Sequence, residues 1–126
     1  MIPKLNYNAD GLIPAIVQDA ASRRVLMMAW MNENSLRLTI ASGFMHYWSR
    51  SRQRFWRKGE SSGHTQRVIR WASDCDADTL LFEVEQTGGA CHTGFASCFF
   101  QAFAPDGTPL EIIEQKVFQP DEIYDK

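Results

Sequence analysis

Short apolar runs separated by turn residues constrain this chain more than any other feature of its sequence. Runs rich in β-branched and aromatic residues are bounded by Gly, Asp and Ser, a pattern that predicts strands joined by tight turns. The expected strands are LIPAIVQD, RRVLMMAW, FMHYWS, RFWRK, QRVIRWA, DTLLFEVEQ and FASCFFQAF. Turns are expected at Asp19–Ser22, in KGESSG and in APDG, whereas the tail LEIIEQKVF fits a helix or a strand equally.

One segment, MNENSLRLTIASG, has helical periodicity instead. Asn32 is a good N-cap, Gly43 stands where a helix-terminating glycine would, and Leu36 and Ile40 share a face. One helix is therefore expected over Glu33–Ser42. The sequence predicts a single compact domain over residues 1–126, of the α+β class but predominantly β, with a mixed sheet or pseudobarrel and one main helix.

The composition indicates the cellular compartment of this domain. The 126 residues are 44% hydrophobic, enough for a real core, and no apolar run approaches the ~20 residues that span a bilayer. The N-terminus MIPKLNYNADG lacks the charged and apolar regions of a secretory signal. Three cysteines without such a signal argue against a disulfide framework. We expect a cytoplasmic protein, in which clustered cysteines bind metal or do chemistry.

The formal net charge of −2 hides an asymmetry along the chain. Residues 47–70 carry seven of the thirteen Lys and Arg residues and one acid, Glu60. Residues 71–126 carry eleven of the fifteen acids and only two lysines. The basic half suits an anionic ligand and the acidic half suits cations, but the whole chain is too acidic for a general nucleic-acid binder.

All three cysteines lie in SDCDADTLLFEVEQTGGACHTGFASC, residues 73–98. Cys75 precedes an expected strand, Cys91 sits on the glycine turn after it, and Cys98 falls in the next expected strand. Cys91 and Cys98 can therefore meet, whereas Cys75 would lie roughly 25 Å from Cys91 at ~3.3 Å per residue. Unless the sheet bends sharply, Cys75 joins the other two from a second copy of the chain, in a site shared across a symmetric dimer.

Three thiolates around zinc leave one position open, which is typical of a catalytic site. Three thiolates give the zinc centre a formal charge of −1, whereas three neutral histidines would leave it at +2. Water bound to the three-thiolate site is therefore acidified less, so a nearby base is needed, for which His92 is the obvious candidate. Three cysteines in a chain of this size equally fit small buried hydrophobes.

The aspartates around Cys75 suggest a second metal. Asp74, Asp76 and Asp78 alternate, so in an extended segment they share one face and repel one another unless a cation binds. Oxygen ligands favour Mg²⁺ or Ca²⁺, while Cys75 on the opposite face favours zinc. The same residues also fit a solvated turn at the start of a strand.

The basic segment HYWSRSRQRFWRKGESSGHTQ combines arginines, hydroxyls and glycines, a set that suits phosphate. Its aromatic residues fit the core or a stack on a base, and the core is the simpler interpretation. His64 is a second proton carrier or a substrate contact, and His46 is structural. The expected substrate-binding residues are Trp48, Ser49, Arg50, Ser51, Arg52, Lys58, Gly59, Glu60, Ser61 and Ser62.

The motifs YWSRSR, FWRKGESSGH, DCDADTLL, VEQTGGACHTG and SCF occur in this order, and from about Leu12 to Phe103 the chain resembles the phosphoribosyl-AMP cyclohydrolases of histidine biosynthesis. The resemblance implies an intertwined homodimer that hydrolyses the N1–C6 bond of 1-(5-phosphoribosyl)-AMP. It implies Mg²⁺ on the three aspartates and zinc on residues from both subunits, matching Cys75, Cys91 and Cys98. Ribosylation at N1 makes C6 electrophilic, so water activated by zinc can attack it.

Other classes of protein remain compatible with these residues. A zinc-stabilised nucleotide-binding module without catalysis would keep the arginines and serines, and would need His92 as a fourth zinc ligand. A thiol redox protein is disfavoured because the chain has no Cys-x-x-Cys pair. We expect a small nucleotide as ligand and neither a nucleic acid nor a membrane as partner.

Overall fold

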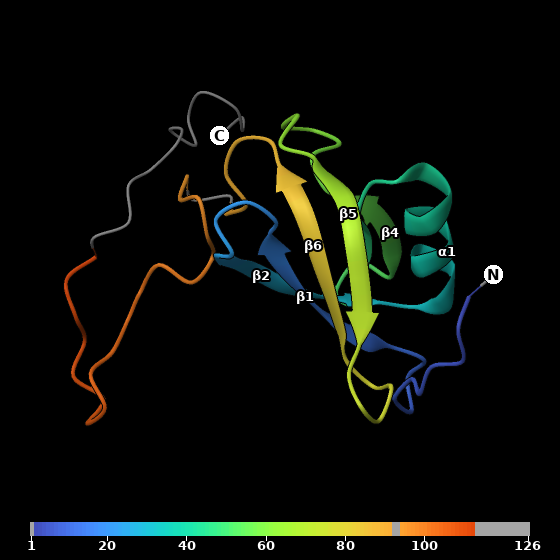
Figure 1. Cartoon of the computed structure of the whole chain (residues 1–126), viewed down its shortest axis with the longest axis horizontal. Helices are drawn as coiled ribbons and strands as arrows, with labels where there is room; N and C mark the ends of the chain where they lie inside the picture. Colours follow the sequence, from blue (N-terminus) through green and yellow to red (C-terminus); the bar gives the residue numbers. More distant parts are fainter. Residues whose placement is uncertain (1, 92–93, 113–126) are drawn as a thin grey trace.

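A computed structural model describes residues 2–91 and 94–112 (Figure 1), and six of the seven expected strands and the helix are present. The helix α1 spans Glu33–Ser42. The strands are β1 (Ile13–Asp19), β2 (Val25–Met31), β3 (His46–Ser49), β4 (Arg54–Arg57), β5 (Gln66–Ser73) and β6 (Leu80–Gln86).

The strands form a mixed sheet and a small second sheet. The order in the four-stranded sheet is β2-β1-β6-β5, with β1 parallel to β6 and the other pairs antiparallel. The antiparallel pair β3–β4 forms the second sheet, and β3 packs against β2 and α1. This confirms the expected α+β class, predominantly β, with one main helix.

Local sequence signals explain why α1 begins and ends where expected. The Asn32 side chain accepts from the Ser35 N–H at 2.8 Å, and the Ser35 hydroxyl accepts from the Asn32 N–H, which completes a capping box. Gly43 ends the helix at φ 82°, a left-handed conformation that suits glycine. Leu36 is fully buried, whereas Ile40 lies at the border of the same helix face and is 41% exposed.

The core lies between the four-stranded sheet, α1 and β3. Alternate residues of β1 are fully buried, namely Ile13, Ala15 and Val17, as expected for a strand with one covered face. Tyr47 of β3 and Phe82 of β6 are among the largest side chains buried there. No helix in the described part of the chain is long and apolar enough to cross a membrane.

The expected strand FASCFFQAF is wrong. Residues 96–102 form no strand; instead the Ser97 hydroxyl donates to Val25 O at 2.7 Å, and the Cys98 N–H donates to Leu26 O at 2.7 Å, beside the edge of β2. A serine side chain that bonds the backbone competes with a regular ladder, which gives a physical reason for the irregular path.

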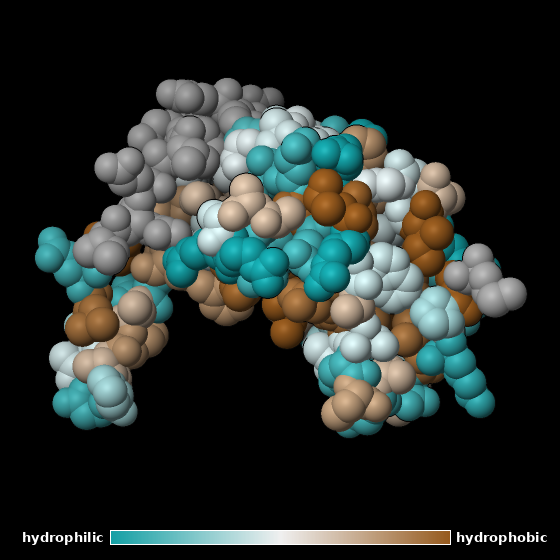
Figure 2. Space-filling view, in the orientation of Figure 1, coloured by the Kyte–Doolittle hydropathy of each residue, from teal (hydrophilic) through white to brown (hydrophobic). Residues whose placement is uncertain are grey.

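Residues 99–112, which we call the arm, then lead away from the sheet (orange to red in Figure 1). The expected APDG turn is present, closed by the Ala104 N–H donating to Thr108 O. Phe99 and Phe103 are 55% and 59% exposed, and Figure 2 shows the arm standing apart from the body across an open hollow. The arm thus exposes large apolar side chains that the described part of its own chain leaves uncovered. Most of LEIIEQKVF lies beyond the described residues.

Candidate active site

Two loops meet at one end of the sheet. The anion loop, residues 58–65, follows β4, and the cysteine loop, residues 87–91, follows β6. The Thr87 N–H donates to Thr65 O at 2.9 Å, and the Lys58 ammonium donates to Ala90 O at 2.6 Å. These two bonds join the loops at both ends, so that the loops are held together.

A buried chain of polar side chains supports both loops. The Tyr47 hydroxyl donates to Gln66 Oε1 at 2.5 Å, and Gln66 Nε2 donates to Gln86 Oε1 at 2.7 Å. Gln86 Nε2 in turn donates to Thr87 O at 2.9 Å, at the start of the cysteine loop. Tyr47 and Gln66 are completely buried, where an unpaired polar group costs about 1–3 kcal/mol. The sequence analysis did not predict this series of hydrogen-bonded side chains, because the series depends on the register between strands.

His64 lies at the contact between the loops. Its Nδ1 atom accepts from the Gly89 N–H at 3.3 Å. A Cβ atom on Gly88 would lie 2.7 Å from the His64 ring, and one on Gly59 would lie 2.6 Å from the His64 carbonyl carbon. Both glycines have positive φ, so their missing side chains permit this close approach. His64 is therefore fixed beside the cysteine loop.

Cys91 and Cys98 lie beside each other and beside Lys58. Partial desolvation of the Cys98 thiol, followed by the charge of Cys91, raises the pKa of Cys98 to about 11, while Lys58 lowers it. A hydrogen bond with Cys91 also contributes to this rise in pKa. One ammonium does not offset two thiolates, so ionisation of both thiols calls for a further cation, and paired thiolates suit zinc.

Cys75 lies elsewhere in the chain. It is exposed in the turn before β6, whereas Cys91 is buried after the end of that seven-residue strand. Figure 1 shows the two connecting loops at opposite ends of β6. Among the residues that the structure describes, no set of three cysteines or histidines gathers in one place. One chain therefore brings together two of the three expected zinc ligands. His92 lies outside the described residues.

The three aspartates come together, but in a turn rather than in an extended strand. Their carboxylate oxygens lie within 4.8 Å of one another. Asp74 accepts from the N–H groups of Asp78 and Thr79 at 3.0 and 3.2 Å, and Ala77 has φ 60°. Aspartate commonly closes a turn in this way, and this makes the expectation of two faces on an extended segment wrong.

The turn crowds these carboxylates. Hydrogen bonds with Asp78 and then Asp74, together with their charges, raise the pKa of Asp76. At Asp74, desolvation is the largest single cause and raises the pKa of the carboxyl, but the hydrogen bonds that it accepts, led by the Asp78 N–H, together outweigh it and lower the pKa. Carboxylates that crowd one another in this way suit an oxygen-liganded cation such as Mg²⁺.

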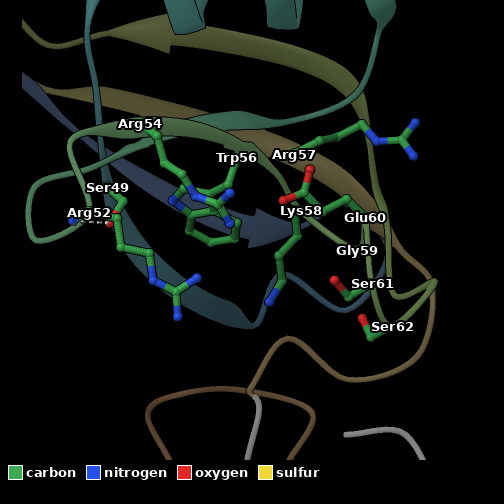
Figure 3. A pocket seen from close by; sticks show the side chains of 10 residues that line it. All are labelled: Ser49, Arg52, Arg54, Trp56, Arg57, Lys58, Gly59, Glu60, Ser61 and Ser62. Atoms are coloured by element: carbon green, nitrogen blue, oxygen red, sulfur yellow. Dashed lines mark hydrogen bonds between the residues drawn. The ribbon is translucent and has the colours of Figure 1, made fainter.

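A pocket of about 390 Å³ opens between the β3–β4 hairpin and the anion loop (Figure 3). Seven of the ten expected substrate-binding residues line it: Ser49, Arg52, Lys58, Gly59, Glu60, Ser61 and Ser62. Arg54, Trp56 and Arg57 also line it, although the guanidinium of Arg57 points away from the other side chains (Figure 3). The hydroxyls and cations of this pocket suit an anionic ligand.

Three expected substrate-binding residues do not line the pocket. Arg50 lies over the Trp30 ring at 4.9 Å, and Trp48 packs edge-to-face on Phe55 with ring centroids 5.0 Å apart. Ser51 is exposed on the turn between β3 and β4, outside the lining.

Strand alternation explains which aromatic residue reaches the pocket. Tyr47 pairs with Trp56 and Trp48 pairs with Phe55 across the hairpin, so the two pairs face opposite sides of the small sheet. The side with Trp56 also carries Arg54. The sequence RFWRK could have revealed this, because alternate residues of a strand face the same side.

Lys58 connects the pocket to the cysteines. Burial lowers the pKa of Lys58, and the charges of Cys98 and Cys91 oppose this shift. The same residue lines the pocket. An anion bound in the pocket would thus lie next to a metal held by the thiols.

Comparisons with known proteins agree on one family. Residues 27–100 match a family model described as phosphoribosyl-AMP cyclohydrolase. A phosphoribosyl-AMP cyclohydrolase of Salinibacter ruber is 54% identical over 125 residues, covering 99% of this chain and 97% of the relative. One of Methanoregula boonei is 52% identical over 126 residues, covering 100% and 98%. One of Thioalkalivibrio sulfidiphilus is 54% identical over 121 residues, covering 95% and 91%.

Proposed function

Because the chain belongs to the phosphoribosyl-AMP cyclohydrolase family, hydrolases of histidine biosynthesis that act on a C–N bond, we propose that it hydrolyses the N1–C6 bond of 1-(5-phosphoribosyl)-AMP. The product is the phosphoribosyl-formimino aminoimidazole carboxamide ribotide. The observation that carries this proposal is the meeting of a cationic pocket and a pair of thiols at Lys58.

We assign the zinc site to Cys91 and Cys98 of one copy and Cys75 of a second copy. Zinc, when bound there, supplies the Lewis acidity that activates water. His92 follows Cys91 directly in the sequence and acts as the base that takes the proton of the attacking water. A proton must then reach N1 as the C6–N1 bond breaks, and His92 or His64, which contacts the cysteine loop at Gly89, delivers it.

Two features of the structure support the proposal that the protein is a homodimer. Cys75 lies at the far end of β6 from the other two cysteines, so a second copy is the simplest source of the third thiolate. The arm exposes Phe99, Phe103 and Leu110, and Leu110 is 47% exposed. Exposed apolar side chains that gather on one segment, unlike single scattered ones, mark protein–protein contacts. Packing of the arm against a second copy would cover them.

Ring opening can be followed directly. We expect the zinc-loaded protein to change the purine absorbance of 1-(5-phosphoribosyl)-AMP, with uptake of one water and no release of ammonia. Release of ammonia would show a deaminase, because the exocyclic nitrogen rather than N1 would then leave. Nucleotide binding without any absorbance change would establish the alternative, a zinc-stabilised module without catalysis.

His92→Ala is expected to retain zinc but to lower the ring-opening rate by about 10²–10⁴-fold, as for loss of a general base. Zinc content and single-turnover rates measure the two effects separately. His46→Ala is the control, because His46 lies in β3 and bonds the Phe44 carbonyl rather than facing the thiols. Loss of zinc from His92→Ala would identify His92 as a ligand, and an unchanged rate would exclude both roles.

We propose that Asp74, Asp76 and Asp78 bind Mg²⁺ and that the ion also contacts a substrate phosphate. Asp76→Asn should then weaken both Mg²⁺ and substrate binding while leaving zinc content intact, because a ligand shared between two binding events links their affinities. Calorimetric titration of Mg²⁺, with and without a non-hydrolysable substrate analogue, measures the linkage. Asp10→Asn, at an exposed position outside the cluster, is the control. Equal Mg²⁺ affinity in the two titrations would make the ion structural only.

A further inference from the structure

We propose that Trp56 is the platform on which the purine ring stacks, and that its indole selects the positively charged, N1-substituted purine over a neutral one. The inference rests on the proposed function and assigns the base-recognition role to one side chain. It departs from the sequence-based expectation, which placed Trp48 in the substrate site and the other aromatics in the core.

The indole of Trp56 is held rigidly at the pocket. It is half-buried and packs on Tyr47, with ring centroids 4.8 Å apart and a tilt of 41°. Tyr47 is completely buried and is fixed by its hydrogen bond to Gln66. The remaining surface of Trp56 lines the pocket, near Arg54 and Lys58 (Figure 3). A rigid aromatic surface that is already in place stacks on a base with little loss of conformational entropy.

The position of Trp56 also suits the reacting carbon. The Lys58 ammonium lies over the indole ring, 5.9 Å from its centre, and the charges of Cys91 and Cys98 act on the same ammonium. A purine stacked on Trp56 would therefore lie one side chain away from the two thiols. Its phosphates would remain within the pocket, where Arg52, Arg54 and the hydroxyls of Ser61 and Ser62 are available.

The charge of the ligand makes this contact selective. Substitution at N1 makes the amidine of adenine more basic, so the ring carries a proton and a positive charge near neutral pH. Cations bind the face of tryptophan more strongly than that of any other aromatic side chain. Glu60, the single acid among the described residues that line the pocket, further offsets a positive ring among the basic residues. The purine ring of AMP is uncharged near neutral pH and lacks this attraction.

The other tryptophans near this hairpin provide matched controls. Trp48 faces the opposite side of the β3–β4 sheet and packs on Phe55. The guanidinium of Arg50 lies over the Trp30 ring at 4.9 Å from its centre, closer than Lys58 lies to the centre of Trp56. Neither lines the pocket. Leucine at either position should therefore leave base recognition unchanged.

The test compares the binding of 1-methyl-AMP, AMP and ribose 5-phosphate to the zinc-loaded protein by calorimetry at neutral pH. We expect the unmodified protein to prefer 1-methyl-AMP to AMP. Trp56→Leu should weaken 1-methyl-AMP binding by about tenfold or more and abolish the preference, with Trp56→Phe intermediate. Ribose 5-phosphate affinity should stay unchanged in Trp56→Leu, which shows that the pocket is intact, and Trp48→Leu should match the unmodified protein.

The inference would be overturned by equal affinity of the unmodified protein for 1-methyl-AMP and AMP, by a preference that survives in Trp56→Leu, or by the same loss in Trp48→Leu. A fall in ribose 5-phosphate affinity equal to that of 1-methyl-AMP would also overturn it, because Trp56 would then only shape the pocket. Ring opening by the unmodified protein tests the proposed function separately. Activity without a preference for 1-methyl-AMP over AMP would therefore reject the role of Trp56 and leave the proposed function standing.

Discussion

Replacing Cys91 with serine is expected to remove tightly bound zinc and to reduce ring opening to background. A hydroxyl is a poor substitute for a thiolate on zinc, and Cys91 is buried beside Cys98, with which it would share the ion. Cys98→Ser and Cys75→Ser should have the same effect, although both residues are exposed and Cys75 lies at the other end of β6.

Zinc stoichiometry by elemental analysis and turnover with 1-(5-phosphoribosyl)-AMP measure these losses together. Thermal unfolding in the presence of chelator shows whether the variants fold as well as the unmodified protein. Serine is nearly isosteric with cysteine, so we expect little change in that metal-free stability. Full zinc content and full turnover in any one of the three variants would exclude the three-thiolate site.

Mixing the Cys75→Ser and Cys91→Ser proteins is expected to restore activity that neither has alone. In a mixed dimer one site carries both defects and the other site is intact. Random exchange of subunits makes half of the dimers mixed, so about a quarter of all sites should recover. Ring-opening activity after dissociation and reassociation, calibrated by bound zinc, measures the fraction.

The matched control mixes Cys91→Ser with Cys98→Ser. In each proposed site, Cys91 and Cys98 come from the same subunit. Every site in that mixed dimer therefore has a defect, and no activity should return. Activity in this control, or none in the first mixture although subunits exchange, would contradict a site divided between Cys75 and the Cys91–Cys98 pair.

Local signals made most of the fold predictable. The helix was expected over its observed range because Asn32 and Gly43 mark its ends by interactions within a few residues. The strand expected around Cys98 was wrong because the Ser97 side chain bonds the backbone of β2, a contact far away in sequence. An apolar composition alone does not distinguish a strand from an irregular segment held against another strand.

The candidate site was predictable where neighbours in sequence stay neighbours in space. The aspartates of residues 74–78 cluster for this reason, although their turn was mistaken for a strand. Cys91 and Cys98 meet because a short connection links them. The hydrogen bond between Gln66 and Gln86 depends on the pairing of β5 with β6, and the position of Trp56 at the pocket depends on the pairing of β3 with β4. Neither could be predicted before the strand register was known.

Anomalous diffraction at the zinc edge, from crystals of the zinc-loaded protein, tests most directly whether the proposed catalytic centre is assembled from two copies. We expect one zinc per chain, bound by Cys91 and Cys98 of one subunit and Cys75 of the other, with one position left to solvent. A zinc ion bound within a single chain, or closed by a fourth protein ligand such as His92, would contradict this arrangement.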